Sequence, residues 1–385
     1  MPNERQISDT PIHGDCLEQF SGVLEAFTAN FREFDEIGAS VCVYLNGKKV
    51  VDLWGGYADA NRTRLWAEDT LVNVWSTTKG IMSLCIARLN DQGLLKNDSP
   101  VADYWPEFGA HGKEAVTVAQ LFSHQAGLCG LSQPVSEDTL LNTDALADLL
   151  AAEPPHWPIG TQSGYHALSI GPLADGLVKR VTGMTVGEYF RKEIAEPAGV
   201  DFHMGLSSKE CARVAEIVHD GKPLNGGPET YNEYQHLALT NLPSHPELAN
   251  LNTWRAQGMP SAGGQGNARS IAAIYGALAG SRILNGVELV SEKALNAATA
   301  IQIEGEDLVL RFPVCWGVGF AMNKGMYAYG PHDTTFGHHG WGGSFGFADP
   351  EYGLGVGYAM NYMREADGAP DPRAVALLES IFASI

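Results

Sequence analysis

The segment from Ser76 to Asn90 restricts the fold most, because its helical pattern is apolar on nearly every side. Apolar residues occupy nearly every face of this helix and leave no polar stripe: Ile81, Met82, Leu84, Cys85, Ile86 and Leu89. A helix of this kind has to be buried within the protein. Gly93 stands just beyond it, where glycine commonly ends a helix. The sequence therefore predicts a buried helix that opens at Ser76, directly after the β-prone segment Val74-Trp75.

The N-terminal region carries the signals of a helix followed by a β-hairpin. Apolar residues recur at helical spacing from Leu17 to Phe31. Two β-prone runs, Ala39–Leu45 and Lys49–Trp54, then flank the dipeptide Asn46-Gly47. An Asn-Gly pair between such runs is the strongest short-range hairpin signal in a sequence. We therefore expect an amphipathic helix that precedes two antiparallel strands.

Helical patterns fill the middle of the chain, and strand patterns return near its end. The helical segments are Val116–Phe122, Thr143–Ala152 and Ser169–Val181, and the later segments are two strands, Val314–Met322 and Gly353–Met360, and an amphipathic helix, Arg373–Ile385. This order predicts the α/β fold class, with an antiparallel sheet flanked by the terminal helices and an inserted all-helical domain. We expect residues 1–85 and 255–385 to form the α/β domain and residues 86–254 the helical domain, with the active site at their interface.

Charge and cysteine usage exclude several classes of function. The 385 residues include 45 acidic and 25 basic ones, a formal net charge of -20, and such a surface repels nucleic-acid phosphates and anionic membranes. No run of residues has the length and apolarity of a membrane span. The N-terminus lacks the pattern of a secretory signal, and the six cysteines form no CxxC pair, as expected of reduced thiols. We expect a cytoplasmic protein without nucleic-acid or membrane partners; its oligomeric state is not predicted.

Ser76-Thr77-Thr78-Lys79 forms an S-x-x-K motif. Residues three apart lie on one face of a helix, so the Lys79 amine can reach the Ser76 hydroxyl. Burial and the positive end of the helix lower the pKa of a lysine, which makes its neutral amine a workable base. The motif alone leaves a structural alternative open, in which Ser76 caps the helix and Lys79 extends to solvent.

Two further segments accompany this motif. Residues 158–167 read PIGTQSGYHA and place Tyr165 where a loop enters a helix, and residues 337–344 read GHHGWGGS before the last strand. Shorter motifs lie at Ser123–Leu128, Val181–Gly183, Glu196–Gly199 and Ala359–Asn361. Together these segments resemble the serine β-lactamase and penicillin-binding-protein superfamily, and specifically the family VIII carboxylesterases, which are similar to class C β-lactamases.

The resemblance implies a role for each matching residue. Ser76 is the nucleophile that becomes acylated, Lys79 is its base, and Tyr165 shares the proton relay. We expect the rate to rise above neutral pH, because both groups work better after losing a proton. The resemblance implies no cofactor and a small ester as substrate.

The glycine-rich segment implies the rest of the site. Trp341-Gly342-Gly343 matches the W-x-G box that binds substrate in these esterases, where β-lactamases carry K-T-G, and His339 is a further candidate for binding substrate. The oxyanion hole then consists of the backbone N–H groups of Ser76 and Ser344. The adjacent His338-His339-Gly340 leaves this alignment open by a few residues.

Two departures from the β-lactamase pattern favour a neutral ester over an anionic lactam. The tyrosine box ends in Ala167 where those enzymes have asparagine, and Trp341 or His338 stands where they have the K-T-G lysine. A β-lactamase, a D-Ala-D-Ala peptidase, an acyltransferase and a non-catalytic penicillin-binding sensor remain as alternatives on the same residues.

Two other patterns in the same region have weaker support. Gly342–Gly346 satisfies G-x-S-x-G, but a strand follows it and no histidine occurs after His339, contrary to the α/β-hydrolase order. His332, Asp333, His338 and His339 could suggest a metal site, but their spacing fits no common zinc pattern. We therefore predict neither a nucleophile elbow nor a metal.

Overall fold

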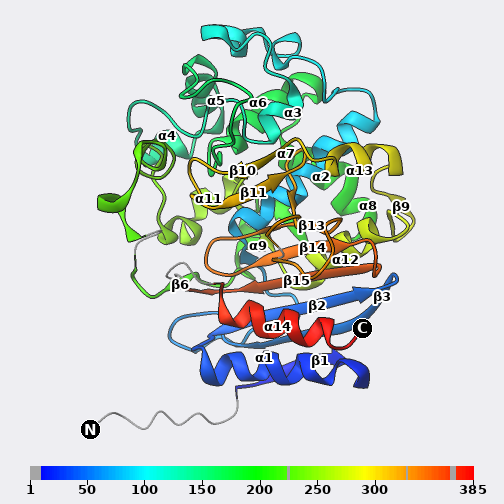
Figure 1. Ribbon diagram of the computed structural model, residues 1–385. Helices are drawn as coiled ribbons and strands as arrows, with labels where there is room; N and C mark the ends of the chain where they lie inside the picture. The colour runs from blue at the N-terminus through cyan, green and yellow to red at the C-terminus, as the bar shows by residue number, and fades with distance from the viewer. Residues whose placement is uncertain (1–9, 223–225, 327, 365–369) are drawn as a thin grey trace.

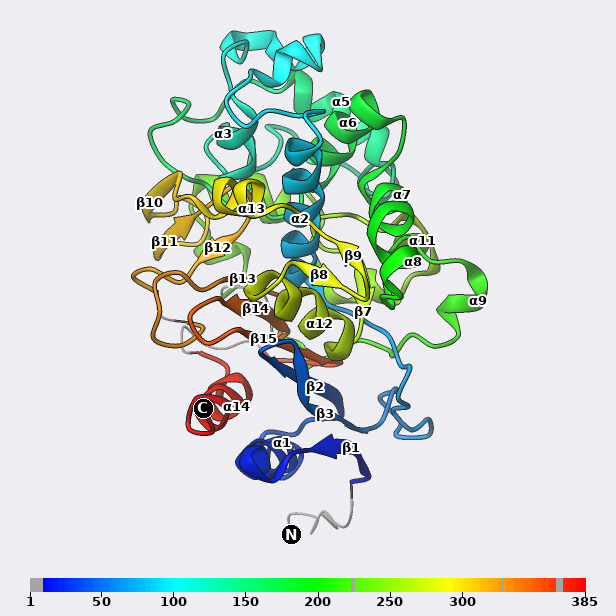
Figure 2. The ribbon, with the colours of Figure 1, turned by 90° about the vertical axis from the view of Figure 1, so that its right-hand side faces the viewer.

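The apolar helix lies at the centre of the molecule (Figure 2). A computed structural model describes residues 10–222, 226–326, 328–364 and 370–385. The predicted helix begins as a 3-10 turn at Trp75–Thr77 and continues as α2 (Thr78–Asp91). Its residues are buried from Thr78 to Ala87, and Gly93 follows it with a φ of 73°. The prediction of a buried helix that ends near Gly93 is confirmed.

A nine-stranded antiparallel sheet has the order β1-β3-β2-β15-β14-β13-β12-β11-β10. Its strands are β1 Ile12–Cys16, β2 Gly38–Leu45, β3 Lys48–Gly56, β10 Ile303–Glu306, β11 Pro313–Trp316, β12 Ala321–Met322, β13 Phe336–His339, β14 Phe345–Asp349 and β15 Leu354–Met360. Strand β15, from the end of the chain, pairs with β2 from its beginning. The N-terminal and C-terminal segments therefore form one sheet (Figure 1).

The predicted hairpin is confirmed as β2 and β3. Asn46 and Gly47 connect the two strands with φ values of 49° and 74°. Both residues thus adopt the left-handed conformation that a tight two-residue turn requires.

Helices cover both faces of the sheet. On one face α12 (Ala268–Ala279) packs closely: a Cβ added to Gly355 would lie 2.0 Å from the backbone nitrogen of Gly276. On the other face Phe347 stacks on Phe382 of α14, with ring centroids 6.4 Å apart. Helix α1 lies beside α14 on that face (Figure 2). The predicted sheet flanked by terminal helices is confirmed.

The strand predicted at Val314–Met322 is instead two short strands, β11 and β12. The chain reverses between them, where the Gly317 N–H donates to Phe320 O at 2.9 Å. Gly319 has a φ of 87°, and a Cβ there would lie 2.2 Å from Ser83 Oγ of α2. Glycine is needed for this turn, because it fits against the central helix.

The helices are α1 Ser21–Glu33, α2 Thr78–Asp91, α3 Val118–Phe122, α4 Glu137–Leu140, α5 Thr143–Ala152, α6 Ile170–Thr182, α7 Val186–Phe190, α8 Glu196–Ala198, α9 Ser208–Cys211, α10 Glu233–Gln235, α11 Asn252–Gln257, α12 Ala268–Ala279, α13 Glu292–Thr299 and α14 Pro372–Phe382. Most of those between residues 86 and 254 lie on the side of the molecule away from the two termini (Figure 1). The expected boundaries at residues 85 and 254 fall inside α2 and α11. The division into two domains at these residues stays a prediction.

The expectation of an all-helical insertion needs one correction. Its second half contributes β5 (Phe202–Met204) and β6 (Val218–His219) to small sheets. Strand β5 joins β4 (Val72–Asn73) and β7 (Gly264–Gly266) in the order β4-β7-β5, and β6 pairs with β16 (Tyr362–Met363). Such pairing depends on strands far apart in the sequence. A further two-stranded sheet joins β8 (Ile283–Leu284) to β9 (Val287–Glu288).

The six cysteines, all within the described part of the chain, are free thiols. Four are buried, whereas Cys16 and Cys211 are partly exposed. None of the described helices combines the length and apolarity needed to span a bilayer.

Candidate active site

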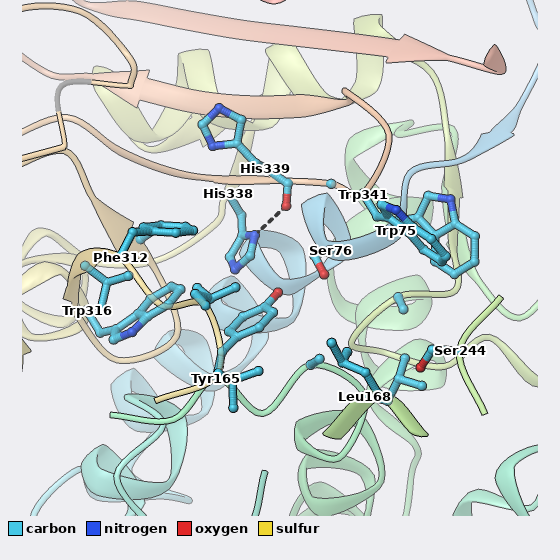
Figure 3. A pocket seen from close by; sticks show the side chains of 18 of the residues that line it. Trp75, Ser76, Tyr165, Leu168, Ser244, Phe312, Trp316, His338, His339 and Trp341 are labelled. Atoms are coloured by element: carbon cyan, nitrogen blue, oxygen red, sulfur yellow. Dashed lines mark hydrogen bonds between the residues drawn. The ribbon is translucent and has the colours of Figure 1, made fainter. Parts of the chain in front are cut away.

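Ser76 lies at the N-terminal end of α2, after a residue with unusual backbone geometry. Trp75 has a φ of 47°, a left-handed conformation that costs energy in a residue other than glycine. Packing holds it there: Trp75 is buried, and its ring centroid lies 4.9 Å from that of Trp341 and 5.9 Å from that of Trp254. The turn leaves Ser76 partly exposed, so that its hydroxyl reaches a pocket (Figure 3).

Lys79 lies one helical turn beyond Ser76 and is fully buried. Its Nζ lies 3.0 Å from Ser76 Oγ and donates to two backbone carbonyls, Ala167 O at 2.7 Å and Ser261 O at 2.8 Å. Burial holds the pKa of the Lys79 amine well below its usual range. The structure thus brings Ser76 and Lys79 together and leaves the lysine no route to solvent.

Three acceptors surround Lys79 Nζ, and burial favours the neutral amine among them. A neutral lysine has two N–H bonds and one lone pair, and the two carbonyls accept the two N–H bonds. Nζ also donates to its third neighbour, Ser76 Oγ, at 3.0 Å, and loss of that third proton leaves a lone pair directed at the Ser76 hydroxyl. A lysine held in this way can take the proton of Ser76 as a general base.

Tyr165 lies beside Lys79 and, like Ser76, lines the pocket. Its ring centroid lies 4.7 Å from Lys79 Nζ, and its phenol oxygen points toward Ser76 (Figure 3). The ring stacks on Trp316, with centroids 5.7 Å apart and an interplanar angle of 6°, and meets His124 edge-on at 5.0 Å. Burial raises the pKa of the Tyr165 phenol further above its usual range. Burial thus favours the neutral phenol over the phenolate, and the part of Tyr165 in a proton relay stays a prediction.

Strand β13 forms the wall opposite Tyr165: it ends with His338 and His339, and Gly340 follows it. All three residues line the pocket, as does Trp341. His338 Nδ1 lies 2.7 Å from His339 O, so Nδ1 carries the proton, and Nε2 has no partner among the described residues. Burial, assisted by the nearby Lys79, lowers the pKa of His338 to about 3. The imidazole is therefore neutral at physiological pH.

Gly342, Gly343 and Ser344 lie behind this wall and do not line the pocket. A Cβ on Gly342 would lie 2.5 Å from Met363 Cγ, and one on Gly343 would lie 2.6 Å from Asp371 Oδ2. Ser344 is buried, and its hydroxyl donates to Val74 O at 2.8 Å. Of the W-G-G segment, the structure brings Trp341 alone to the pocket.

The two alternative sites of the same region have ordinary structural explanations. The G-x-S-x-G segment joins β13 to β14, a strand-turn-strand arrangement rather than strand-turn-helix. His332 Nδ1 lies 2.8 Å from Asp349 Oδ2, whereas His339 stacks on Tyr329 with centroids 4.4 Å apart. Among the described residues, no three His, Cys, Asp or Glu side chains are grouped so that they could hold a metal ion.

The pocket encloses about 260 Å³. Its lining residues are Trp75, Ser76, Tyr165, Ala167, Leu168, Leu239, Ser244, Leu248, Ala262, Val309, Leu310, Phe312, Val314, Cys315, Trp316, Ala321, Met326, Tyr329, His338, His339, Gly340 and Trp341. None of these is a lysine, arginine, aspartate or glutamate. Aromatic residues flank Ser76 on two sides, with Trp75 and Trp341 on one and Phe312 and Trp316 on the other (Figure 3).

Sequence reasoning missed the contribution of the hairpin β10–β11. It supplies Trp316, which stacks on Tyr165, and Phe312, which is 44% exposed at the pocket. The sequence pattern places Trp316 in the predicted strand Val314–Met322, but a strand pattern alone does not say what the strand faces, and Phe312 lies outside that segment. Ser261, whose carbonyl binds Lys79, left no signal at all, because a backbone carbonyl is independent of residue type.

Comparisons with known proteins agree over nearly the whole chain. The family named Beta-lactamase matches residues 27–380. The chain is 34% identical over 374 residues to the "Esterase/beta-lactamase LipL" of Mycobacterium tuberculosis, covering 92% of this chain and 83% of that protein.

Two solved structures are also similar. A family VIII carboxylesterase is 42% identical with a TM-score of 0.91, covering 97% of this chain and all of that one. A penicillin-binding-protein homologue from Caulobacter crescentus is 41% identical with a TM-score of 0.92, covering 98% of this chain and all of that one. The resemblance drawn from the sequence motifs is confirmed: the chain belongs to the beta-lactamase family.

Proposed function

We propose that this chain is a serine carboxylesterase that hydrolyses small neutral esters through an acyl intermediate on Ser76. The observation that supports this best is the position of Lys79 Nζ, which is buried, held by two backbone carbonyls and 3.0 Å from Ser76 Oγ. The similar family VIII carboxylesterase and the esterase named LipL support the same activity.

In the first half-reaction, Ser76 Oγ attacks the ester carbonyl carbon as its proton moves to Lys79 Nζ. The carbonyl oxygen becomes an oxyanion, which we place between the backbone N–H groups of Ser76 and Trp341. Both residues line the pocket, and neither N–H donates to another group in the described chain. Two such donors contribute the largest electrostatic term in many acyl transfers. Trp341 takes the role first expected of Ser344, which lies outside the pocket.

The intermediate then collapses and the C–O bond to the alcohol breaks. The leaving oxygen receives a proton from the Tyr165 phenol, which is replenished from the Lys79 ammonium. In the second half-reaction water attacks the acyl carbon and gives its proton to the same base. Cleavage of the bond to Ser76 Oγ releases the carboxylic acid and restores the hydroxyl.

The walls of the pocket support a neutral, apolar substrate. Because the leaving alcohol needs its proton from Tyr165, the alcohol group belongs on the side of Tyr165, Phe312 and Trp316. The acyl group then lies toward Trp75 and Trp341. Both sides offer aromatic surface and no charged partner.

A β-lactamase activity on the same residues is disfavoured because the described pocket lining contains no lysine or arginine to bind an anionic substrate. A β-lactam carries a carboxylate, and either Trp341 or neutral His338 stands where related enzymes place a lysine. Loss of one charge-assisted contact is worth roughly 1.5 to 3 kcal/mol, or about ten- to a hundredfold. Ala167 also has no side-chain amide to orient a lactam.

The test is kcat/KM for p-nitrophenyl butyrate and for nitrocefin on one preparation, with Ser76→Ala as the control for background hydrolysis. We expect the ester to be cleaved far faster, and a fluorophosphonate adduct to map to Ser76. A ratio near or below one would move this protein to the lactamase side of its family. A burst without steady-state turnover would identify a sensor, and product esters formed in the presence of an added alcohol would identify an acyltransferase.

As part of this proposal we place the enzyme in the cytoplasm, in keeping with its six free thiols. The test is fractionation of the native host. Recovery of the enzyme from the periplasm or the medium would contradict this assignment.

A further inference from the structure

A buried carboxylate outside the expected catalytic set adjoins the site. Asp307 is fully buried and begins the turn between β10 and β11. None of the ion pairs among the described residues includes it. Instead, its two oxygens accept hydrogen bonds from four donors.

The four donors come from two segments. Oδ1 accepts the backbone N–H groups of Tyr165, Val309 and Leu310, each at 2.9 Å, and Oδ2 accepts the Ser163 hydroxyl at 2.7 Å. A carboxylate is an acceptor only, so this set of neighbours matches its ionised form. Three converging N–H groups can hold an anion without a counter-cation.

These bonds join a catalytic segment to a wall of the pocket. Ser163 and Tyr165 belong to the loop before α6, whereas Val309 and Leu310 line the pocket from the β10–β11 turn. A backbone bond from Leu308 N to Ser163 O, 2.9 Å long, ties the same two segments. The side chain of Asp307 therefore sets the position of the Tyr165 backbone relative to the surface on which a substrate would lie.

We propose that Asp307 is a positioning residue that holds Tyr165 at a fixed distance from the pocket wall formed by Val309 and Leu310. An alcohol group that lies against this wall is then within reach of the Tyr165 phenol, which delivers the proton. This inference rests on the proposed function, because it assumes that Tyr165 relays a proton. Asp307 acts through Tyr165 and touches no reacting atom. The hairpin reinforces it through Trp316, whose ring stacks on that of Tyr165.

The test is a double-mutant cycle on the full chain with p-nitrophenyl butyrate, comparing wild type, Asp307→Ala, Tyr165→Phe and the double variant. We expect Asp307→Ala to lower kcat about 10- to 100-fold, within the range of general acid–base effects. In the Tyr165→Phe background the same change should lower kcat by less than about threefold, because the group that it positions is already gone. Asp307→Asn should restore kcat to within about fivefold, since its Oδ1 still accepts three N–H groups and its amide can donate to Ser163 Oγ.

Asp349→Ala is the matched control for loss of a buried carboxylate. Asp349 is also fully buried and accepts His332 Nδ1 and the backbone N–H groups of Glu351 and Tyr352, but it does not line the pocket. The Asp349→Ala substitution should lower the free energy of unfolding without a change in kcat. If circular dichroism shows Asp307→Ala to be unfolded, Asp307→Ser, whose shorter hydroxyl reaches fewer of the donors, replaces it in the cycle.

Equal losses of kcat from the Asp307 change in both backgrounds, or no rescue by Asp307→Asn, would overturn the positioning role and leave Asp307 purely structural. Near-normal kcat in Tyr165→Phe would instead refute the proton relay of the proposed function. The two failures are therefore distinguishable within one set of variants.

Discussion

Replacing Lys79 with methionine removes the amine from beside Ser76 and keeps a side chain of similar length. The change removes the amine that takes the Ser76 proton in the proposed mechanism. It also leaves Ala167 O and Ser261 O, which accept from Nζ at 2.7 and 2.8 Å, without that donor. The variant therefore loses both a base and two buried hydrogen bonds.

The expected loss of activity follows from the protonation of the amine. A lysine at its usual pKa of about 10.4 is neutral in roughly one molecule in a thousand at pH 7.4, which costs about 4 kcal/mol. Burial of Lys79 lowers its pKa and removes much of that cost. We therefore expect Lys79→Met to lower kcat/KM for p-nitrophenyl butyrate by about 10³- to 10⁴-fold, the upper part of the range for a general base.

The chain contains a matched control for the structural damage. Lys113 is also fully buried, and its Nζ donates to two backbone carbonyls, Ala110 O at 2.7 Å and Glu153 O at 2.6 Å. Lys113→Met removes the same kind of contact away from the pocket. Each unsatisfied buried carbonyl costs about 1 to 3 kcal/mol, so both variants should unfold at lower urea concentration.

Only the Lys79 variant should lose activity when both are assayed well below their unfolding transitions. If Lys79→Met stays within tenfold of wild type, or if Lys113→Met loses as much activity, the assignment of Lys79 as the base is refuted.

Four further outcomes are expected. Tyr165→Phe should lower kcat about 100-fold without a change in the circular dichroism spectrum, and a near-normal rate would remove Tyr165 from the mechanism. Because burial lowers the pKa of Lys79 and raises that of Tyr165, kcat/KM should rise with pH as Lys79 loses its proton and then level off; a second rise between pH 8 and 10 in a stopped assay would contradict a neutral phenol. Arg373→Met should lower the free energy of unfolding by about 3 to 5 kcal/mol, because it leaves the fully buried Glu36, 3.1 Å away, without its partner; a denaturant midpoint like that of wild type would contradict this. Esterase activity should survive EDTA, since the Ser–Lys–Tyr relay needs no Lewis acid; loss of activity that zinc restores would show otherwise.

Local sequence determined the parts of this protein that depend on short-range geometry. Ser76 and Lys79 meet because residues three apart share a helical face, and the apolar pattern around them required burial. The Asn46-Gly47 turn follows from the left-handed backbone that both residues tolerate. These features needed no knowledge of the rest of the chain.

The motifs around Tyr165 and β13 could be located from the sequence but not aligned in space. Two neighbouring triplets, His338-His339-Gly340 and Trp341-Gly342-Gly343, were both candidates for the substrate wall. The end of β13 decides between them: the first triplet stays beside the pocket, whereas the chain turns away after Trp341 toward Met363 and Asp371. The pairing of β13 with β14 and the packing of α14 set this turn, and neither is encoded locally.

Only the tertiary structure brought Ser261, Asp307 and the β10–β11 hairpin to the nucleophile. Each lies more than 180 residues from Ser76 in the chain, and the contacts are made through backbone carbonyls, backbone N–H groups and ring faces. Backbone groups are the same in every residue except proline, so no sequence pattern marks where they will converge. The pairing of Ser76 with Lys79, the proposed nucleophile and base, is thus local information, whereas the lowered pKa of Lys79, the position of Tyr165 and the walls of the pocket arise from burial and long-range packing.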